Sequence, residues 1–205
     1  MTKALASLRQ GVLRPQDAAN IYTQPRLQFR RLEADGVLLK IANGYYALVP
    51  EANRGSQWRP EIESLALGIG QADYGVNEAI LMHLSAARLQ SAIPRAIAVA
   101  VIAVPKRRPA LETPYGRIVF VKRDVTRLKR IKVKTELGDG WSTSKEQTAL
   151  DLAGRPDLVK GLSQVAQEAA RSIFVLCNKT KLDSIANDQR LKSALSRLTQ
   201  WVNSD

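Results

Sequence analysis

Arginine and glutamine side chains are concentrated between residues 24 and 31, where they have the chemistry to read the bases of DNA. Arginine matches the O6 and N7 atoms of guanine and glutamine matches N6 and N7 of adenine, because each side chain offers two suitably spaced hydrogen-bonding atoms. The residues concerned are Gln24, Arg26, Gln28, Arg30 and Arg31. A charged, solvated helix face is the alternative explanation, so the interpretation depends on the elements around this run.

The elements expected around it follow the order of a winged helix-turn-helix. Short helices are expected over residues 3–10 and 15–21, the second opened by Pro15, whose missing N–H is no loss in a first helical turn. A third helix is expected to begin after Thr23, a good N-cap residue, and to end near Gly36. We expect this third helix to enter the major groove of DNA.

Two further features complete this N-terminal unit. Leu27, Phe29 and Leu32 are expected to face inward and to hold the third helix to the rest of the domain. Asn43 and Gly44 separate two β-rich runs, and this pair is a strong hairpin signal because both residues tolerate the backbone of a tight turn. The hairpin would form the wing.

Contacts to the DNA backbone are expected beside the reading helix. Lys40 and Asn43 lie near the tip of the hairpin, where they would touch a phosphate or the minor groove. Arg14, just before the second helix, is placed to contact a phosphate. The predicted DNA-binding set is Arg14, Gln24, Arg26, Gln28, Arg30, Arg31, Lys40 and Asn43.

A second basic region lies further along the chain. The formal net charge is +12, and eleven of the 31 Lys and Arg residues fall within residues 105–134, against two acidic residues. Such a surface favours a polyanionic partner, either a nucleic acid or an acidic protein surface. Strand alternation over residues 128–134 would place cations on one face and Ile131 and Val133 on the other. The predicted basic patch is Arg117, Lys122, Arg123, Arg127, Lys129, Arg130, Lys132 and Lys134.

Catalytic and metal-binding constellations are scarce in the sequence. The one histidine, His83, has apolar neighbours and is expected to be a partly buried structural residue, and the one cysteine, Cys177, is expected to be a buried thiol. No Gly-rich phosphate loop is present. We therefore expect no enzyme activity, metal or cofactor. The longest apolar stretch is far too short for a membrane span, and with no signal peptide the expected location is the cytoplasm.

The fold class expected from these patterns is α+β with two domains. Residues 1–55 would form the winged helix-turn-helix. After a polar linker, residues 56–205 would form a mixed α/β domain with a small sheet and C-terminal helices. Its strands are expected over residues 96–104, 116–122 and 128–133, and helices dominate from residue 143 onward.

Three segments of the chain resemble the abortive-infection AbiEi-type antitoxins, and the overall length and sequence are similar to the mycobacterial members of that group. The first is GVLRPQDAANIY with LQFRRLEADGVLLKIANGYYAL, the second YGVNEAILMHLSAARLQSAIPRAIAVAV and the third STSKEQTALDLAGRPDL. In the third segment the matching residues are Glu146, Thr148, Leu150, Asp151 and Leu152. Together the segments fall within residues 10–175.

The resemblance implies a two-domain cytosolic antitoxin. Its N-terminal domain would bind inverted repeats in the promoter of its own operon and repress it. Its C-terminal domain would be needed to neutralise a cognate nucleotidyltransferase toxin, directly or indirectly. Two alternatives stay open: a winged-helix regulator whose second domain binds an unrelated partner or ligand, and an RNA-binding or nucleic-acid-processing protein that uses the basic region as its channel.

Overall fold

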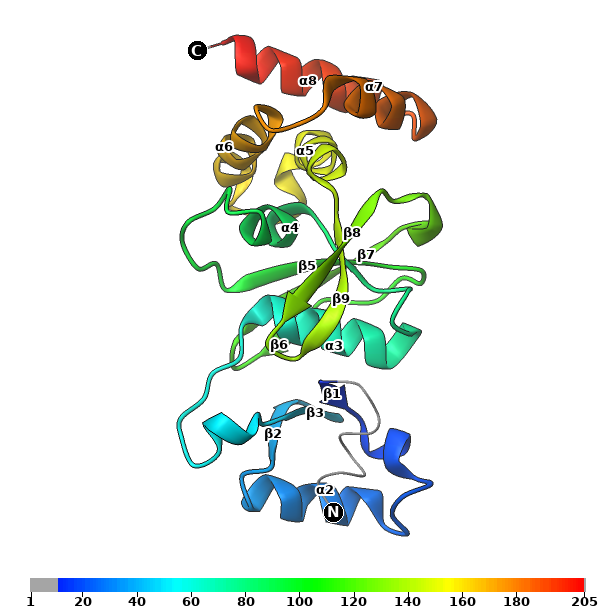
Figure 1. The fold of residues 1–205 in the computed structure, drawn as a ribbon, viewed down its shortest axis with the longest axis vertical. Helices are drawn as coiled ribbons and strands as arrows, with labels where there is room; N and C mark the ends of the chain where they lie inside the picture. Colours follow the sequence, from blue (N-terminus) through cyan, green and yellow to red (C-terminus); the bar gives the residue numbers. More distant parts are fainter. Residues whose placement is uncertain (1–10, 205) are drawn as a thin grey trace.

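The computed structural model describes residues 11–204, in a mixed α and β fold with two separate sheets. Figure 1 shows the N-terminal unit at one end, a central six-stranded sheet in the middle and the C-terminal helices at the other end. The helix expected over residues 3–10 lies outside the described residues. No helix within residues 11–204 is long and apolar enough to cross a membrane.

Over the described residues 11–55, the N-terminal unit is a three-stranded antiparallel sheet with one α-helix and two short 3-10 helices, the second at Glu51–Asn53. Its strands are arranged in the order β1-β3-β2. The hairpin around Asn43 is confirmed, and Gly44 has a φ of 81°, a conformation that glycine adopts without steric cost. The elements are β1 (Val12–Leu13), η1 (Pro15–Ala18), α2 (Pro25–Ala34), β2 (Leu38–Ala42) and β3 (Tyr45–Leu48).

Helix α2 packs on this sheet through Phe29 and Leu32, both buried as expected, and the Phe29 ring meets Tyr46 edge-on with centroids 5.2 Å apart. The inward position expected for Leu27 is wrong, since its side chain is 38% exposed. The reason is helical geometry: residues two apart are separated by roughly 200° around the axis, so Leu27 and Phe29 point to opposite sides.

The central sheet is mixed, with the order β6-β7-β5-β4-β9-β8. The pairs β5–β7 and β4–β9 are parallel, and the other three pairs are antiparallel. The strand expected over residues 116–122 is confirmed, whereas the one expected from residue 96 begins at Val99, where its pairing with Arg117 starts. The strands are β4 (Ile80–Leu81), β5 (Val99–Val104), β6 (Leu111–Thr113), β7 (Gly116–Lys122), β8 (Arg130–Thr135) and β9 (Gly138–Thr143).

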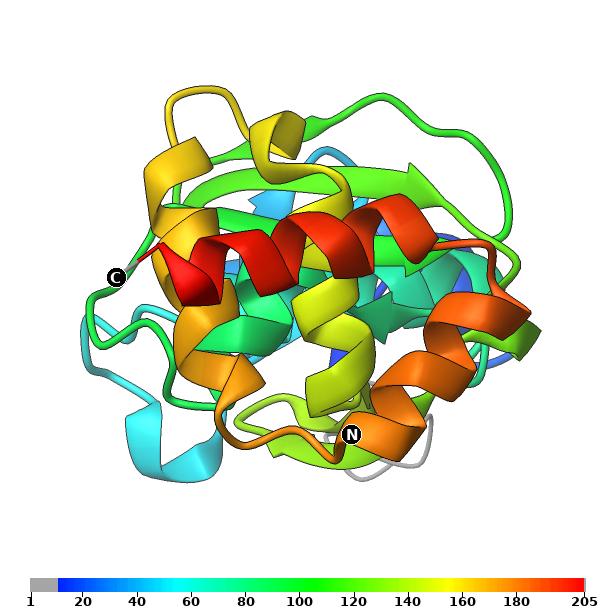
Figure 2. The same ribbon diagram turned by 90° about the horizontal axis from the view of Figure 1, so that it is seen from above.

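Helices cover both faces of this sheet. Helix α3 lies on one face, and α4, α5 and α6 lie on the other, with α7 and α8 forming an outer layer above them (Figures 1 and 2). Small side chains let α5 and α6 approach each other closely, because Ala149, Ala153, Ala166 and Ala170 are all buried. The helices are α3 (Ile62–Tyr74), α4 (His83–Leu89), α5 (Lys145–Gly154), α6 (Ser163–Phe174), α7 (Lys179–Asp188) and α8 (Lys192–Asn203).

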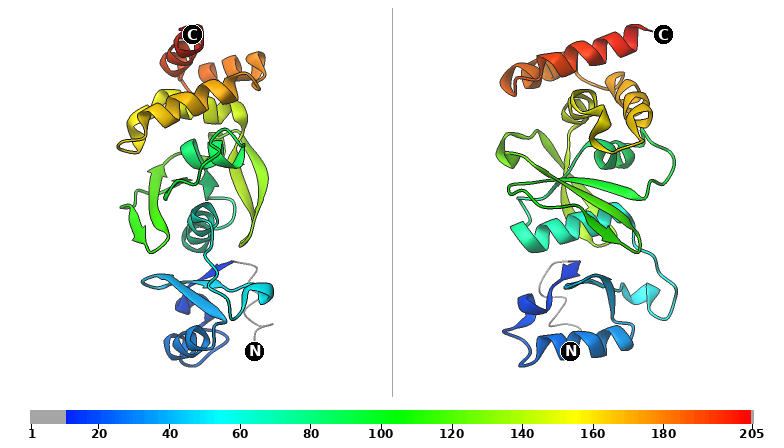
Figure 3. Two further views of the ribbon diagram at one scale, coloured as in Figure 1. Left: turned by 90° about the vertical axis from the view of Figure 1, so that its left-hand side faces the viewer. Right: turned by 180° about the vertical axis from the view of Figure 1, so that it is seen from behind.

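Helix α3 is buried on two sides, because it separates the N-terminal unit from the central sheet (Figure 3). Val12 of β1 packs against Gly68, where an added Cβ would lie 2.4 Å from the Val12 Cγ2 atom. Val12 and Ala47 belong to the same apolar cluster as Leu65 and Ile69 of α3. The N-terminal unit therefore shares a hydrophobic core with the rest of the chain.

His83 is completely buried at the start of α4, deeper than the partly buried position expected from the sequence. Its Nε2 atom lies 3.0 Å from the carbonyl oxygen of Arg155, so the neutral ring donates there, while Nδ1 has no hydrogen-bond partner. Its φ of 55° is unusual for a residue other than glycine. Burial lowers the pKa of His83 from 6.5 to about 4.

This histidine predicts a specific acid sensitivity. Above pH 6.5 His83 is neutral in both the folded and the unfolded chain. As the pH falls from 6.5 toward about 4, the unfolded chain binds a proton that the fold excludes, so the free energy of unfolding falls by roughly 1.4 kcal/mol per pH unit. Asparagine tolerates the same left-handed backbone. In His83→Asn, chemical denaturation between pH 7 and pH 4 is expected to lack that slope. A slope equal to that of the natural chain would contradict the assignment.

Candidate nucleic-acid interface

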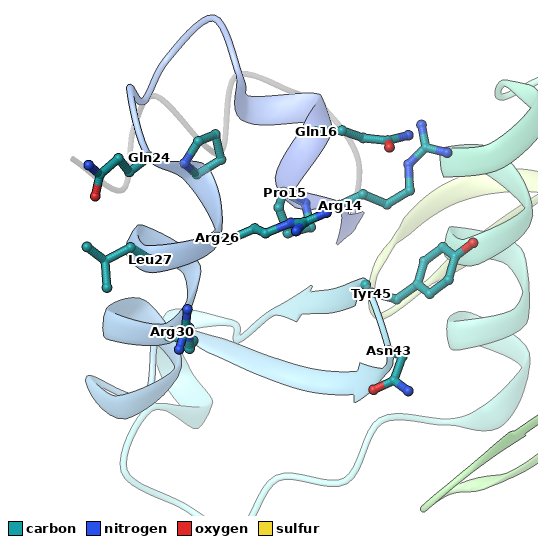
Figure 4. Close-up of a pocket in the computed structure, with 11 residues that line it drawn as sticks. Arg14, Pro15, Gln16, Gln24, Arg26, Leu27, Arg30, Asn43 and Tyr45 are labelled. Carbon is teal, nitrogen blue, oxygen red and sulfur yellow. The ribbon is translucent and has the colours of Figure 1, made fainter.

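The outer face of α2 and the tip of the β2–β3 hairpin enclose a groove of about 640 Å³. Figure 4 shows Arg26 and Arg30 on α2 facing this space, with Asn43 at the hairpin tip across from them. All three side chains are exposed. Phe29 and Leu32 hold the opposite side of the helix to the sheet, so the cations are presented outward on a fixed element.

The predicted DNA-binding residues do not all lie on one surface of the structure. Those that line the groove are Arg14, Gln24, Arg26, Arg30 and Asn43. Gln28 and Arg31 instead line a neighbouring hollow together with Gln24 and Leu27, and Lys40 is exposed on β2 outside both. The exposed Leu27 therefore lies among the polar residues of this surface. The sequence already contained the signal for this position, because Leu27 is two residues from Phe29 and must therefore point to the opposite side of the helix.

Arg14 lies at the edge of the groove, but its guanidinium points toward α3 rather than into the open space (Figure 4). It bonds Asp17 at 2.7 Å and Asp73 of α3 at 3.0 Å. The hydrogen bond to Asp17 is the largest cause of the raised pKa of Arg14. A phosphate contact by Arg14, as expected from the sequence, would have to compete with these two carboxylates. In the structure Arg14 instead links the N-terminal unit to α3 through its ion pair with Asp73.

Asp73 is the centre of a polar network that joins the N-terminal unit to the rest of the chain. The Tyr45 hydroxyl donates to Asp73 at 2.8 Å, and Arg108 forms an ion pair with the same carboxylate. The Arg108 guanidinium also lies 4.4 Å from the centroid of the Phe120 ring. Arg108 falls within the basic stretch 105–134, but the sequence gives no sign that its charge is neutralised by α3.

Charge and burial explain why these groups stay together. Asp73 occupies the last turn of α3, where the helix dipole disfavours a negative charge, so the two arginines offset an unfavourable position. The Asp73 side chain is 14% exposed. Burial, followed by the hydrogen bond to Asp73, raises the pKa of Tyr45. The network thus fixes the hairpin that borders the groove.

Substituting Asp73→Asn is expected to lower the free energy of unfolding by about 2 kcal/mol, because both arginines lose a charged partner in a partly buried site. For a chain of this length that corresponds to a fall of roughly 6 °C in melting temperature. Thermal denaturation of the full chain would measure it. Asp139→Asn, which neutralises an exposed carboxylate, is the matched control. Equal melting temperatures for the two variants would contradict a structural role for the network.

The predicted basic patch is not a single surface. Arg117 and Lys122 lie on β7, and β8 lies at the far edge of the six-stranded sheet with three strands between them. Arg123 is occupied in the structure by the buried carboxylate of Asp151, at 2.9 Å. Arg127 donates to the carbonyl oxygen of Asp188 at the end of α7. The eight residues of the predicted basic patch therefore do not form one continuous surface.

What remains exposed on β8 is a smaller basic surface beside an aromatic ring. The Arg130 guanidinium lies 4.4 Å from the centroid of the Trp141 ring, and Lys132 lies 5.9 Å from it. Asn77 fixes both partners, accepting from Arg130 at 2.8 Å and from the Trp141 indole at 3.0 Å. Lys132, Lys134 and Trp141 line a shallow hollow on this surface. Trp141 was missed by sequence reasoning, although it lies directly opposite Lys132 in the hairpin register.

The opposite face of β8 carries Ile131 and Val133, as the alternation predicts, but it is not fully buried. Ile131 is 43% exposed and Val133 is half-buried. The alternation itself is correct, but β8 is an edge strand, so less of the protein covers it than covers the central strands.

Among residues 11–204, no group of three or more His, Cys, Asp or Glu side chains is arranged to hold a metal ion. Burial, the largest cause, raises the pKa of Cys177 to about 12, so this thiol stays protonated at neutral pH. The chain matches no protein-family model and no curated protein.

Proposed function

We propose that this chain is a DNA-binding regulator with an N-terminal winged helix, of the kind that serves as the antitoxin of a toxin–antitoxin pair, and that it has no catalytic role. The observation that carries the DNA-binding part is the outer face of α2. Arg26 and Arg30 are exposed there, one helical turn apart, beside the exposed tip of a hairpin. Exposed cations on an anchored helix suit the major groove.

The chemistry of this face supports base reading as well as phosphate binding. Arg26 and Arg30 each offer two donors for guanine, and Gln24 suits adenine. Leu27, 38% exposed between them, is suited to an apolar contact with the methyl group of thymine. Asn43 and Lys40, on the hairpin, are placed for the adjacent backbone or minor groove. The helix would thus read sequence, and the wing would fix its register.

The antitoxin part rests on the resemblance to the AbiEi-type family. Its second and third segments contain α4 and α5, which pack together around one apolar core. Thr148, Leu150, Asp151 and Leu152 of the third segment are buried. Their burial makes them part of the core of this region, and we assign none of them to toxin contact.

Binding of the full chain to DNA from its own promoter, against DNA of scrambled sequence, tests the regulator. We expect tighter binding to the promoter, by about a thousandfold at physiological salt, and a log affinity that falls linearly with log salt concentration. Equal affinity for both DNAs would leave only a general phosphate-binding surface and would overturn the proposal.

A winged-helix regulator with an unrelated partner is the second candidate function. The identity of the adjacent gene separates the two, since an antitoxin of this kind requires a nucleotidyltransferase-like neighbour whose expression arrests growth. A harmless neighbour together with specific promoter binding would favour the second candidate.

A further inference from the structure

The strand β8 presents an unpaired backbone edge. It is the last strand of the six-stranded sheet, and no other described strand pairs with its outer side. The Ser144 N–H donates to the Lys129 carbonyl at 2.8 Å, which makes Lys129 and Ser144 a hydrogen-bonded pair in the register of this hairpin. In an antiparallel ladder such pairs alternate along the strand. Ile131 and Val133 therefore bond to β9.

The same alternation turns the backbone groups of Arg130, Lys132 and Lys134 away from β9, toward the free edge. These three residues also place their side chains on one face, the face of Trp141. Along six residues, the edge thus offers three outward N–H groups and three outward carbonyls, and each of these positions carries a cationic side chain. Ile131, exposed on the other face, lies between them.

We propose that the outer edge of β8 binds an extended segment of a partner protein, which adds to the sheet as a seventh strand and carries acidic side chains at alternate positions. The acidic side chains would lie beside Arg130, Lys132 and Lys134. The residues between them would be apolar and would cover Ile131 and Val133. The inference is independent of DNA binding by α2, because β8 belongs to the six-stranded sheet and α2 packs on the three-stranded one.

Charge and shape complementarity favour a protein segment over a nucleic acid at this edge. The Trp141 ring carries the Arg130 guanidinium on one face, at 4.4 Å, and that occupies the place where a base would stack. The exposed Ile131 side chain has an apolar counterpart in an extended peptide and none in a phosphate chain. Strand addition to an exposed edge is a common mode of peptide recognition.

The direct test uses the full chain and a labelled seven-residue peptide of alternating Glu and Val, compared with a peptide of the same composition whose Glu residues are all at one end. Fluorescence anisotropy is expected to give about tenfold tighter binding of the alternating peptide. On binding, amide hydrogen exchange by NMR is expected to slow at Arg130, Lys132 and Lys134. Exchange at Ile131 and Val133, already bonded to β9, should change little.

Two substitutions at one position separate the backbone contribution from the charge. Lys132→Gln removes the charge and keeps the outward N–H, whereas Lys132→Pro also removes that donor, at an edge position where proline is tolerated. We expect the proline variant to bind the peptide about fivefold more weakly than the glutamine variant. Should the proline variant fail to fold, amide protection in the natural chain still decides the question.

Three outcomes would overturn the proposal. One is equal binding of the two peptides, and another is peptide binding without protection of the three outward amides. The third is displacement of the alternating peptide by a single-stranded oligonucleotide whose affinity falls in a Lys132→Gln, Lys134→Gln variant, because that would identify the edge as a nucleic-acid surface.

Discussion

Replacing Arg26 and Arg30 together by alanine is expected to weaken binding to the promoter DNA by about thirtyfold or more, at about 1–3 kcal/mol for each lost base contact. Both side chains are exposed on α2 and line the groove below the hairpin tip. Neither contributes to the core, so the fold should be unchanged. Fluorescence anisotropy at fixed salt concentration measures the affinity, and circular dichroism checks the fold.

A matched control removes the same charge elsewhere. Lys179→Ala with Lys192→Ala neutralises two exposed cations at the start of α7 and α8, at the far end of the molecule (Figure 1). That variant should retain nearly full affinity. The single substitution Arg31→Ala, in the hollow beside the groove, is expected to weaken binding as well. If the arginine and lysine variants lose affinity equally, only net charge matters and α2 is not the reading helix.

Substituting Arg123→Gln is expected to destabilise the fold by about 3 kcal/mol at neutral pH, since it leaves the carboxylate of Asp151 buried without its cation. The Asp151 side chain is 1% exposed and bonds Arg123 at 2.9 Å. Burial, the largest cause, raises the pKa of Asp151 above its ordinary 3.8, and Arg123 opposes this shift. Without Arg123 the pKa of Asp151 should rise further.

The sign of the pH dependence follows from this. A carboxyl whose pKa is raised in the fold destabilises it above that pKa, and the penalty disappears as the pH falls and the group is protonated. The gap in unfolding free energy between the natural chain and Arg123→Gln should therefore be largest near pH 7 and narrow toward pH 4. Chemical denaturation at several pH values measures it, with Lys122→Gln, at an exposed neighbour, as the control. A gap that is constant with pH would mean that the buried charge is not its origin.

Local patterns in the sequence were sufficient for several elements. The Asn43–Gly44 hairpin and the strand over residues 116–122 were predicted correctly, because turn chemistry and a β-branched run act over a few neighbouring residues. Phe29 and Leu32 were correctly placed in the core. Leu27 was not, because its hydrophobicity was given more weight than its angle around the helix.

The basic stretch shows why the rest could not be predicted. Arg108, Arg123 and Arg127 are close in sequence, but each is bound by a different helix: α3, α5 and the end of α7. Their partners are 35, 28 and 61 residues away in the chain. A count of local charge treats all three as exposed, whereas tertiary contacts decide which cations remain available to a partner.

Trp141 and Asp73 illustrate the same limit from the other side. Neither belongs to a recognisable motif, and each becomes important only through strand register or helix packing. Trp141 lies opposite Lys132 because the hairpin turns at residues 136–137, and Asp73 meets Arg14 because β1 packs on α3.

Co-expression with the adjacent gene in a growth assay tests the antitoxin proposal most directly. The full chain should be used, because deletion of residues 1–55 would expose the side of α3 that Val12 now covers. We predict that the neighbouring gene arrests growth, and that both the natural chain and the Arg26→Ala, Arg30→Ala variant restore it, since the resemblance to the AbiEi-type family implies that the C-terminal domain is the part needed for neutralisation. A harmless neighbour, or arrest that the natural chain does not relieve, would contradict the proposal.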